Sequence, residues 1–210
     1  MAMRLARILL TLPLLAAAAD NTSKKVILIV GPPGGGKTTQ AKKISQKYGI
    51  PSISLPDLLK ENSGWGKAGA GRKGVKAAIE SGELANDEVA DQLMRDRLLR
   101  NDAQRGFVLD GYPATGKQAE NLEALLKERG LPLPLVVHLE VPDDIATKRM
   151  KARHRADDDP KTISRRLAEY HREAAPILER YKGDRVITVN GAQSEKEVWH
   201  SIETALAESH

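Results

Sequence analysis

The sequence lacks cysteine and contains very few aromatic residues. None of its 210 residues is Cys, and Phe, Trp and Tyr together make up 3%. The absence of thiols excludes disulfides, thiolate zinc sites and a cysteine nucleophile. Few aromatic rings are available to stack on bases, and no run of lysines is present. We therefore expect the positively charged residues, which give a net charge of +5, to bind small phosphate-containing ligands and not a nucleic acid.

A glycine-rich segment at residues 31–38 is the clearest motif. It reads Gly-Pro-Pro-Gly-Gly-Gly-Lys-Thr and matches the P-loop pattern G-x-x-x-x-G-K-T. An apolar run at 26–30 precedes it and a helix-forming segment at 38–48 follows, as a P-loop requires. Glycines leave backbone N–H groups bare for a polyphosphate, and the helix start favours an anion. The alternative is a Gly/Pro turn that binds nothing.

The motif therefore predicts ATP binding. Lys37 is expected to reach the β- and γ-phosphates, and the Thr38 hydroxyl to lie near Mg²⁺. The predicted ATP-binding residues of this segment are Gly31, Gly34, Gly35, Gly36, Lys37, Thr38 and Thr39.

The remaining pattern alternates strands with helices over residues 25–210, which we interpret as one domain. Hydrophobic residues make up 40% and charged residues 29%, as in globular proteins. This alternation predicts a P-loop NTPase-like α/β/α fold, with a five-stranded parallel sheet covered on both faces. The expected strands are 26–30, 52–54, 107–109, 135–139 and 186–189. The expected helices are 38–48, 56–62, 75–81, 87–100, 118–129, 142–153, 162–181 and 195–208.

An acidic residue ends the third expected strand. The run 107–109 is followed by Asp110. Together with the P-loop, Asp110 is expected to hold Mg²⁺ through a water molecule. The alternative is a carboxylate that caps the next turn. Gly111 follows Asp110 where an ATPase would place a Glu to activate water. This favours a kinase whose acceptor is already a phosphate anion.

Four arginines lie in the C-terminal half: Arg149, Arg153, Arg155 and Arg166. Arg149 and Arg153 share a helix face at i, i+4 spacing. Planar, permanently charged guanidinium groups suit a transferring phosphoryl group. The alternative for each is a solvated surface charge, paired with the acidic run 157–159.

These segments together resemble the adenylate kinase and nucleoside monophosphate kinase family. The resemblance rests on GPPGGGKTTQ (31–40), GFVLDGYPAT (106–115), Gln118-Ala119, RHRADD (153–158) and RLAEY (166–170), and it covers about residues 25–208. It implies a P-loop core, a helical insert at about 54–86 that binds the monophosphate, and a short lid at about 153–162. The lid should close over the substrates and exclude water.

The resemblance also implies roles for individual residues. Arg149 would pack on the ATP base, and Gln118 would read the acceptor base, because an amide can hydrogen-bond an adenine edge in two directions. Gly111 would let the acceptor approach the backbone. The implied catalytic residues are Lys37, Arg153, Arg155 and Arg166, and the implied acceptor-binding residues are Leu55, Lys60, Ala85, Gly111 and Gln118.

The sequence departs from the family pattern on the acceptor side. Ala114 stands where the family usually has an Arg that contacts the acceptor phosphate, and Leu55 replaces a Thr. Lys60 replaces an Arg, so a point charge replaces a bidentate fork. A lost charge-assisted contact is worth roughly 1.5–3 kcal/mol, about tenfold or more in acceptor binding. On the ATP side, Thr38 replaces the family's usual Gly.

Three hypotheses follow. The first is a Mg²⁺-dependent kinase that transfers a phosphoryl group from ATP to a nucleoside monophosphate, with AMP as the expected acceptor. The second is a P-loop kinase with another acceptor, for which Asp57 is the candidate general base. The third is an ATP-binding module weakened at its acceptor site. We expect a monomer that binds no nucleic acid.

The first 24 residues have the pattern of a secretory signal peptide. Arg4 and Arg7 precede the apolar run 8–15, and Ala16–Ala19 offer A-x-A-like cleavage sites. The run is too short to span a bilayer, so no stable membrane span is expected after processing. A mitochondrial presequence or a misassigned start codon are the alternatives. The pattern favours export, whereas a need for ATP favours the cytoplasm or an ATP-containing organelle, and both remain open.

Overall fold

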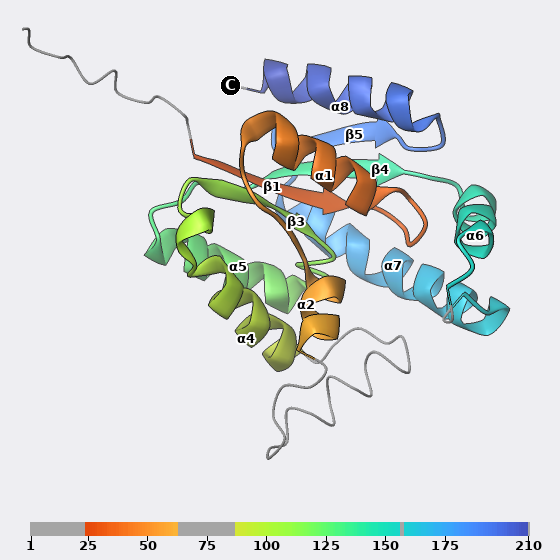
Figure 1. The fold of residues 1–210 in the computed structure, drawn as a ribbon, viewed down its shortest axis with the longest axis horizontal. Coiled ribbons are helices and arrows are strands. Elements are labelled where there is room, and N and C mark those ends of the chain that lie inside the picture. Colours follow the sequence, from red (N-terminus) through yellow and green to blue (C-terminus); the bar gives the residue numbers. More distant parts are fainter. Residues whose placement is uncertain (1–23, 63–86, 156–157, 210) are drawn as a thin grey trace, which may run out of the picture.

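The computed structural model describes residues 24–62, 87–155 and 158–209, and its centre is a five-stranded sheet (Figure 1). Every strand pairing is parallel and the strand order is β2-β3-β1-β4-β5. The strands are β1 (Lys25–Val30), β2 (Ser52–Ser54), β3 (Gly106–Asp110), β4 (Leu135–Glu140) and β5 (Val186–Asn190). The predicted fold class is therefore confirmed.

Helices connect the strands at nearly the predicted positions. They are α1 (Lys37–Tyr48), α2 (Leu55–Glu61), α4 (Asp87–Leu98), α5 (Gly116–Glu128), α6 (Asp143–Ala152), α7 (Pro160–Arg180) and α8 (Glu195–Glu208), with a short 3₁₀ helix at Asn101–Ala103. Side chains cap several of them: Thr115 begins α5, Asp159 begins α7, and Ser194 forms a capping box with Glu197 at α8. The helix predicted over 87–100 ends at Leu98, because the chain turns there into the 3₁₀ helix.

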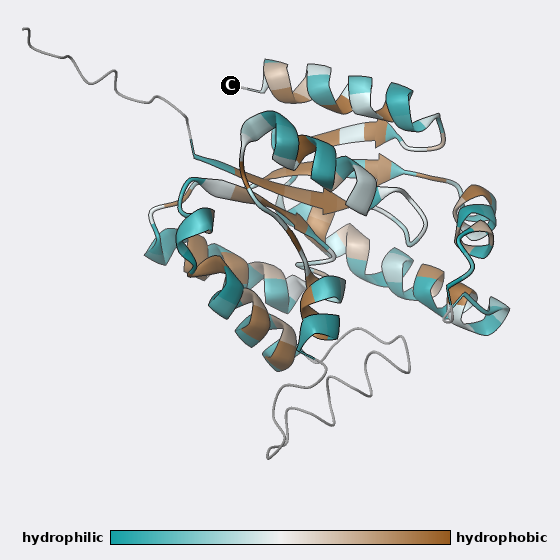
Figure 2. Cartoon of the chain, viewed as in Figure 1, coloured by the Kyte–Doolittle hydropathy of each residue, from teal (hydrophilic) through white to brown (hydrophobic). Residues whose placement is uncertain are grey.

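Helices cover both faces of the sheet, which explains why the central strands are mainly apolar (Figures 1 and 2). One core contains residues of α1 and α8, including Ile44, Val198 and Ile202, packed against β1, β3 and β4. The opposite core packs α4, α5 and α7 on the sheet, through residues such as Met94, Leu122 and Ile177. A smaller apolar cluster joins α6 to the start of α7.

The parallel register brings the carboxyl ends of the strands to one edge. Asp110 at the end of β3 pairs with Ile29 of β1 and with Ser54 of β2. Glu140 at the end of β4 pairs with Asn190 of β5. Loops that follow these strands therefore meet at a single edge, where ligands bind in open α/β sheets.

Some predictions concern residues outside the described ranges. They include the N-terminal signal pattern, the helix expected over 75–81, and Ala85. The limits of the insert and of the lid remain predictions. Within residues 24–62, 87–155 and 158–209, no helix is both long and apolar enough to cross a membrane.

Candidate active site

The P-loop connects β1 to α1, and its glycines are required for two different reasons. Gly34 and Gly36 have φ values of 80° and 87°, in the left-handed region that glycine favours. Gly31 and Gly35 are required for space instead: a Cβ on Gly35 would lie 2.8 Å from the carbonyl oxygen of Pro32. The loop thus keeps side chains away from its backbone N–H groups, as phosphate binding demands.

Lys37 lies at the start of α1 and its ammonium group is held by the loop itself. Nζ donates to the carbonyl oxygens of Gly31 at 2.8 Å and Pro32 at 2.9 Å. Burial lowers the pKa of Lys37, the Asp110 carboxylate opposes that shift, and Arg153 adds to it. Lys37, Asp110 and Arg153 are therefore close enough to interact electrostatically, although they come from separate elements.

Thr38 and Asp110 form the pair predicted for a metal. The Thr38 hydroxyl donates to Asp110 Oδ2 at 2.5 Å, and Asp110 is only 4% exposed. No group of three or more His, Asp or Glu able to hold a metal occurs within the described ranges. Mg²⁺ needs no such group, because it is commonly bound by one or two carboxylates together with substrate phosphates and water. The hydroxyl and carboxylate oxygens of this pair suit that cation.

A cavity of about 260 Å³ opens beside the P-loop, between α1 and the loop that joins β5 to α8. Arg149 of α6 lines it. One guanidinium nitrogen of Arg149 donates to Gly191 O at 2.7 Å, and the other donates to the carbonyl oxygens of Ala192 and Gln193, each at 3.1 Å. These hydrogen bonds hold the guanidinium group at the cavity wall, and its packing on the ATP base stays a prediction.

Thr39 and Gln40 of α1 also line this cavity. Gln40 is 2% exposed, its Nε2 donates to Glu195 O at 3.2 Å, and its Oε1 has no partner. Gln40 was not selected from the sequence as a site residue. The sequence could have identified Gln40, because it is a polar residue at a position expected on the buried face of an amphipathic helix.

Among the predicted catalytic arginines, Arg153 forms an ion pair with Asp158. Arg153 donates to both Asp158 carboxylate oxygens, at 2.8 and 2.7 Å, and the Arg155 backbone N–H donates to Oδ2 at 3.1 Å. The hydrogen bond from Arg153 holds the pKa of Asp158 below its usual value, with the nearby Arg166 contributing in the same direction. Arg153 and Arg166 therefore lie near one carboxylate, whereas the Arg155 side chain is exposed.

The acceptor-side residues differ in their exposure. Gln118 is 1% exposed, and Gly111 has a φ of 77° with Pro56 so close that a Cβ would lie 3.0 Å from its Cδ. Lys60 is exposed, with Nζ 4.0 Å from Asp57 Oδ1. Leu55 is buried in the core under α4 and α5, so its contact with an acceptor stays a prediction.

Asp87 was not identified from the sequence as part of the acceptor side. Its Oδ1 accepts from Gln118 Nε2 at 2.8 Å, and Thr115 Oγ1 lies within hydrogen-bonding distance of both its oxygens. From the sequence, Asp87 was interpreted only as the start of a helix, where acidic residues are common. Its partners lie 28 and 31 residues away and carry no local signal.

The fold and these contacts define the class of protein. A P-loop that follows a central strand of a parallel sheet, a Thr–Asp pair at that loop and an arginine lining the adjacent cavity are parts of a P-loop phosphotransferase. Its chemistry is the transfer of a phosphoryl group between nucleotides.

The family follows from comparison with known proteins. Residues 29–186 match the family model described as adenylate kinase. The adenylate kinase of Corynebacterium aurimucosum is 42% identical over 162 residues, which cover 77% of this chain and 88% of that protein. The adenylate kinase of Rhizobium meliloti is 38% identical over 182 residues, covering 81% and 94%, and that of Mycolicibacterium smegmatis is 39% identical over 172 residues, covering 82% and 93%. The chain belongs to the adenylate kinase family.

Proposed function

We propose that this nucleoside monophosphate kinase transfers the terminal phosphoryl group of ATP to AMP and forms two ADP. The observation that carries the proposal is the P-loop with Lys37 held against its carbonyl oxygens and the Thr38–Asp110 hydrogen bond beside it, at the carboxyl edge of the sheet. The similarity to adenylate kinases over about three quarters of the chain supports the choice of acceptor.

On the ATP side, Lys37 changes partners when the nucleotide binds. Its ammonium group leaves the carbonyl oxygens of Gly31 and Pro32 and donates to the phosphate oxygens instead. The desolvation that lowers its pKa also strengthens its attraction for an anion, because little water competes in the site. Arg149 covers the base from the neighbouring cavity.

Thr38 and Asp110 would hold Mg²⁺, and that cation would neutralise the negative charge of the β- and γ-phosphates. Arg153 and Arg166 stabilise the charge on the equatorial oxygens of the phosphoryl group during transfer. The backbone turn at Gly111 carries no carboxylate that could activate water. Transfer to a phosphate needs no such base, so the site favours transfer over hydrolysis.

We expect AMP to bind more weakly than it would with an Arg at position 114. Ala114 contributes only its backbone N–H, which donates to Gln118 Oε1 at 2.7 Å. A charge-assisted contact to the acceptor phosphate is therefore absent from position 114, at a cost of roughly 1.5–3 kcal/mol. We expect a correspondingly high KM for AMP, with ATP binding unaffected.

An acceptor screen tests the proposal. Purified protein is given ATP with AMP, CMP, UMP or GMP, in Mg²⁺ or in excess chelator, and ADP is followed with a coupled assay. We expect Mg²⁺-dependent ADP formation that is fastest with AMP, and its loss in Lys37→Met. Turnover with none of the four monophosphates, in a protein that still binds ATP, would support a nucleotide-binding module instead.

Residues 1–24 bear on location and stay a separate proposal. We propose that the Ala16–Ala19 run is a cleavage site of an export signal. Sequencing the N-terminus of the mature protein is then expected to find an end at or near Asp20. An intact Met1 or Ala2 end would contradict it.

A further inference from the structure

The buried amide of Gln118 has its orientation fixed by two partners of opposite character. Its Oε1 accepts from the Ala114 backbone N–H at 2.7 Å, and its Nε2 donates to Asp87 Oδ1 at 2.8 Å. A backbone N–H can only donate and a carboxylate oxygen can only accept. The oxygen and nitrogen of this amide therefore cannot exchange places without losing both bonds.

Asp87 is itself held in place by Thr115. The Thr115 hydroxyl lies 3.1 and 3.2 Å from the two Asp87 oxygens, and it also accepts from the Gln118 backbone N–H at 3.2 Å. The three side chains join the first turn of α4 to the first turn of α5. We call Thr115, Asp87 and Gln118 the amide relay.

These two contacts use half of the hydrogen-bonding capacity of the Gln118 amide. A carboxamide has two N–H donors and two lone pairs on its oxygen, and the relay uses one of each. The free N–H and the free lone pair match a base edge that offers one acceptor and one donor side by side. The N1 atom and N6 amino group of adenine form such an edge. Guanine presents O6 and N1–H there, so donor and acceptor are reversed.

We infer that Asp87 is a positioning residue that makes Gln118 select adenine over guanine in the acceptor. The inference rests on the proposed function, because it assigns the Gln118 side to the acceptor base. Binding guanine in the same place would require the amide to turn over. Its NH₂ group would then face the Ala114 N–H, and its oxygen would face the Asp87 carboxylate. Both contacts are repulsive in a site where Gln118 is 1% exposed.

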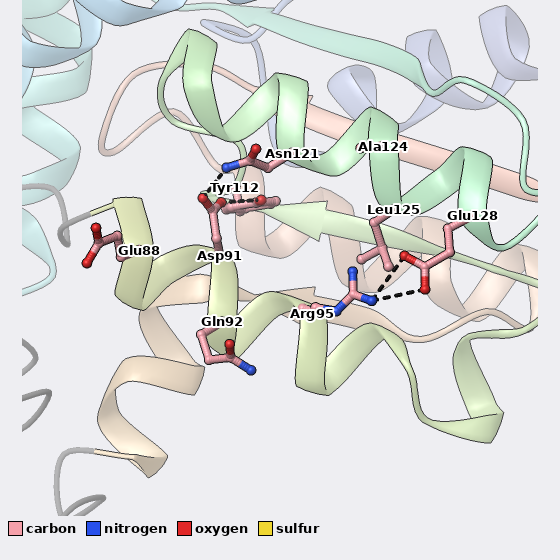
Figure 3. Close-up of a pocket in the computed structure, with 9 residues that line it drawn as sticks. All are labelled: Glu88, Asp91, Gln92, Arg95, Tyr112, Asn121, Ala124, Leu125 and Glu128. Carbon is pink, nitrogen blue, oxygen red and sulfur yellow. Dashed lines mark hydrogen bonds and ion pairs between the residues drawn. The ribbon is translucent and has the colours of Figure 1, made fainter.

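Asp91 provides a matched control one turn further along α4 (Figure 3). Its carboxylate accepts from the Tyr112 hydroxyl at 2.6 Å and from Asn121 Nδ2 at 2.5 Å. This cluster also joins α4 to α5, and it lines a cavity of about 410 Å³ between them. It makes a comparable structural connection, but the described contacts do not include the Gln118 side-chain amide.

The test compares Asp87→Asn with Asp91→Asn in the full chain. An Asn at position 87 offers both a donor and an acceptor, so only the Ala114 N–H then opposes the reversed orientation of the Gln118 amide. We expect the ratio of kcat/KM for AMP to that for GMP to fall about tenfold in Asp87→Asn, as one mismatched buried hydrogen bond implies. The KM for ATP should not change. Asp91→Asn should lower Tm to a similar degree and leave the ratio unchanged.

A second variant and a second measurement complete the test. Thr115→Val removes the hydroxyl that holds Asp87, and we expect a smaller shift of the ratio in the same direction. Dissociation constants for AMP and GMP, measured by calorimetry, should change in the same ratio as the kinetics. An unchanged ratio in Asp87→Asn, or an equal change in Asp91→Asn, would overturn the role of Asp87. If the unmodified chain transfers to no monophosphate, the proposed function fails, and the calorimetric ratio still decides the inference.

Discussion

Replacing Arg149 with Lys should weaken ATP binding and leave AMP binding unchanged. The guanidinium group donates three hydrogen bonds to the carbonyl oxygens of residues 191–193 while lining the cavity beside the P-loop. An ammonium group can replace one of these bonds, but it has no planar face to cover a base.

The expected size follows from the lost contacts. Hydrogen bonds to a charged group contribute about 1.5–3 kcal/mol when buried, and this site is partly open to water. We expect a net loss of about 2 kcal/mol after the ammonium group keeps one bond, which corresponds to roughly a thirtyfold rise in the KM for ATP.

The assay is a coupled measurement of ADP with each substrate varied at saturating levels of the other. Arg180→Lys is the matched control, because Arg180 binds Glu123 through two hydrogen bonds between α7 and α5 and lines neither described cavity. Arg180→Lys should leave the KM for ATP unchanged. The reasoning is refuted if Arg149→Lys changes the KM for ATP by less than about twofold, or if it raises the KM for AMP equally.

The remaining predictions concern three other parts of the site. Ala114→Arg should lower the KM for AMP about tenfold, since it restores a charged contact to the acceptor phosphate; an unchanged KM in steady-state kinetics would contradict this. Lys37→Met should reduce kcat at least about a hundredfold without lowering Tm, because it removes a phosphate contact and also a partly buried charge; a folded variant with near-normal kcat would exclude the assigned role. Asp158→Asn should lose a stabilising contribution that depends on pH. The depressed pKa of Asp158 means that this contribution is complete above the unfolded value of about 3.9 and disappears as pH falls through the folded value. The stability difference between the two proteins, measured by denaturant unfolding, should therefore shrink below about pH 4, and a difference that stays constant in acid would contradict this.

The fold could be predicted because its signals are local. Strands buried on both faces read as continuous apolar runs, and the glycine loop at 31–38 marks the turn from β1 into α1. The closing helix expected over 195–208 was likewise visible in sequence. Asp110 could be recognised because the strand before it and the P-loop together gave it a context.

The detailed contacts could not be predicted, because their partners are distant or belong to the backbone. Arg149 and Arg153 were expected to share a helix face, yet the structure directs them to different partners. Arg149 reaches carbonyl oxygens more than 40 residues away. Arg153 binds Asp158, a member of the acidic run that the sequence had offered as an alternative partner. Every residue has a backbone carbonyl oxygen, so no sequence pattern identifies which of them accepts a hydrogen bond. Asp87 was missed for a similar reason, since its role depends on how α4 and α5 pack.

The central claim is that the phosphoryl group passes directly from ATP to AMP. The most direct measurement uses ATP labelled with phosphorus-32 at its γ-position, mixed with AMP and Mg²⁺, with the products separated by chromatography. We predict that the label appears in the β-phosphate of ADP, with two ADP formed for each ATP consumed. Label released as inorganic phosphate, with AMP left unchanged, would contradict the claim.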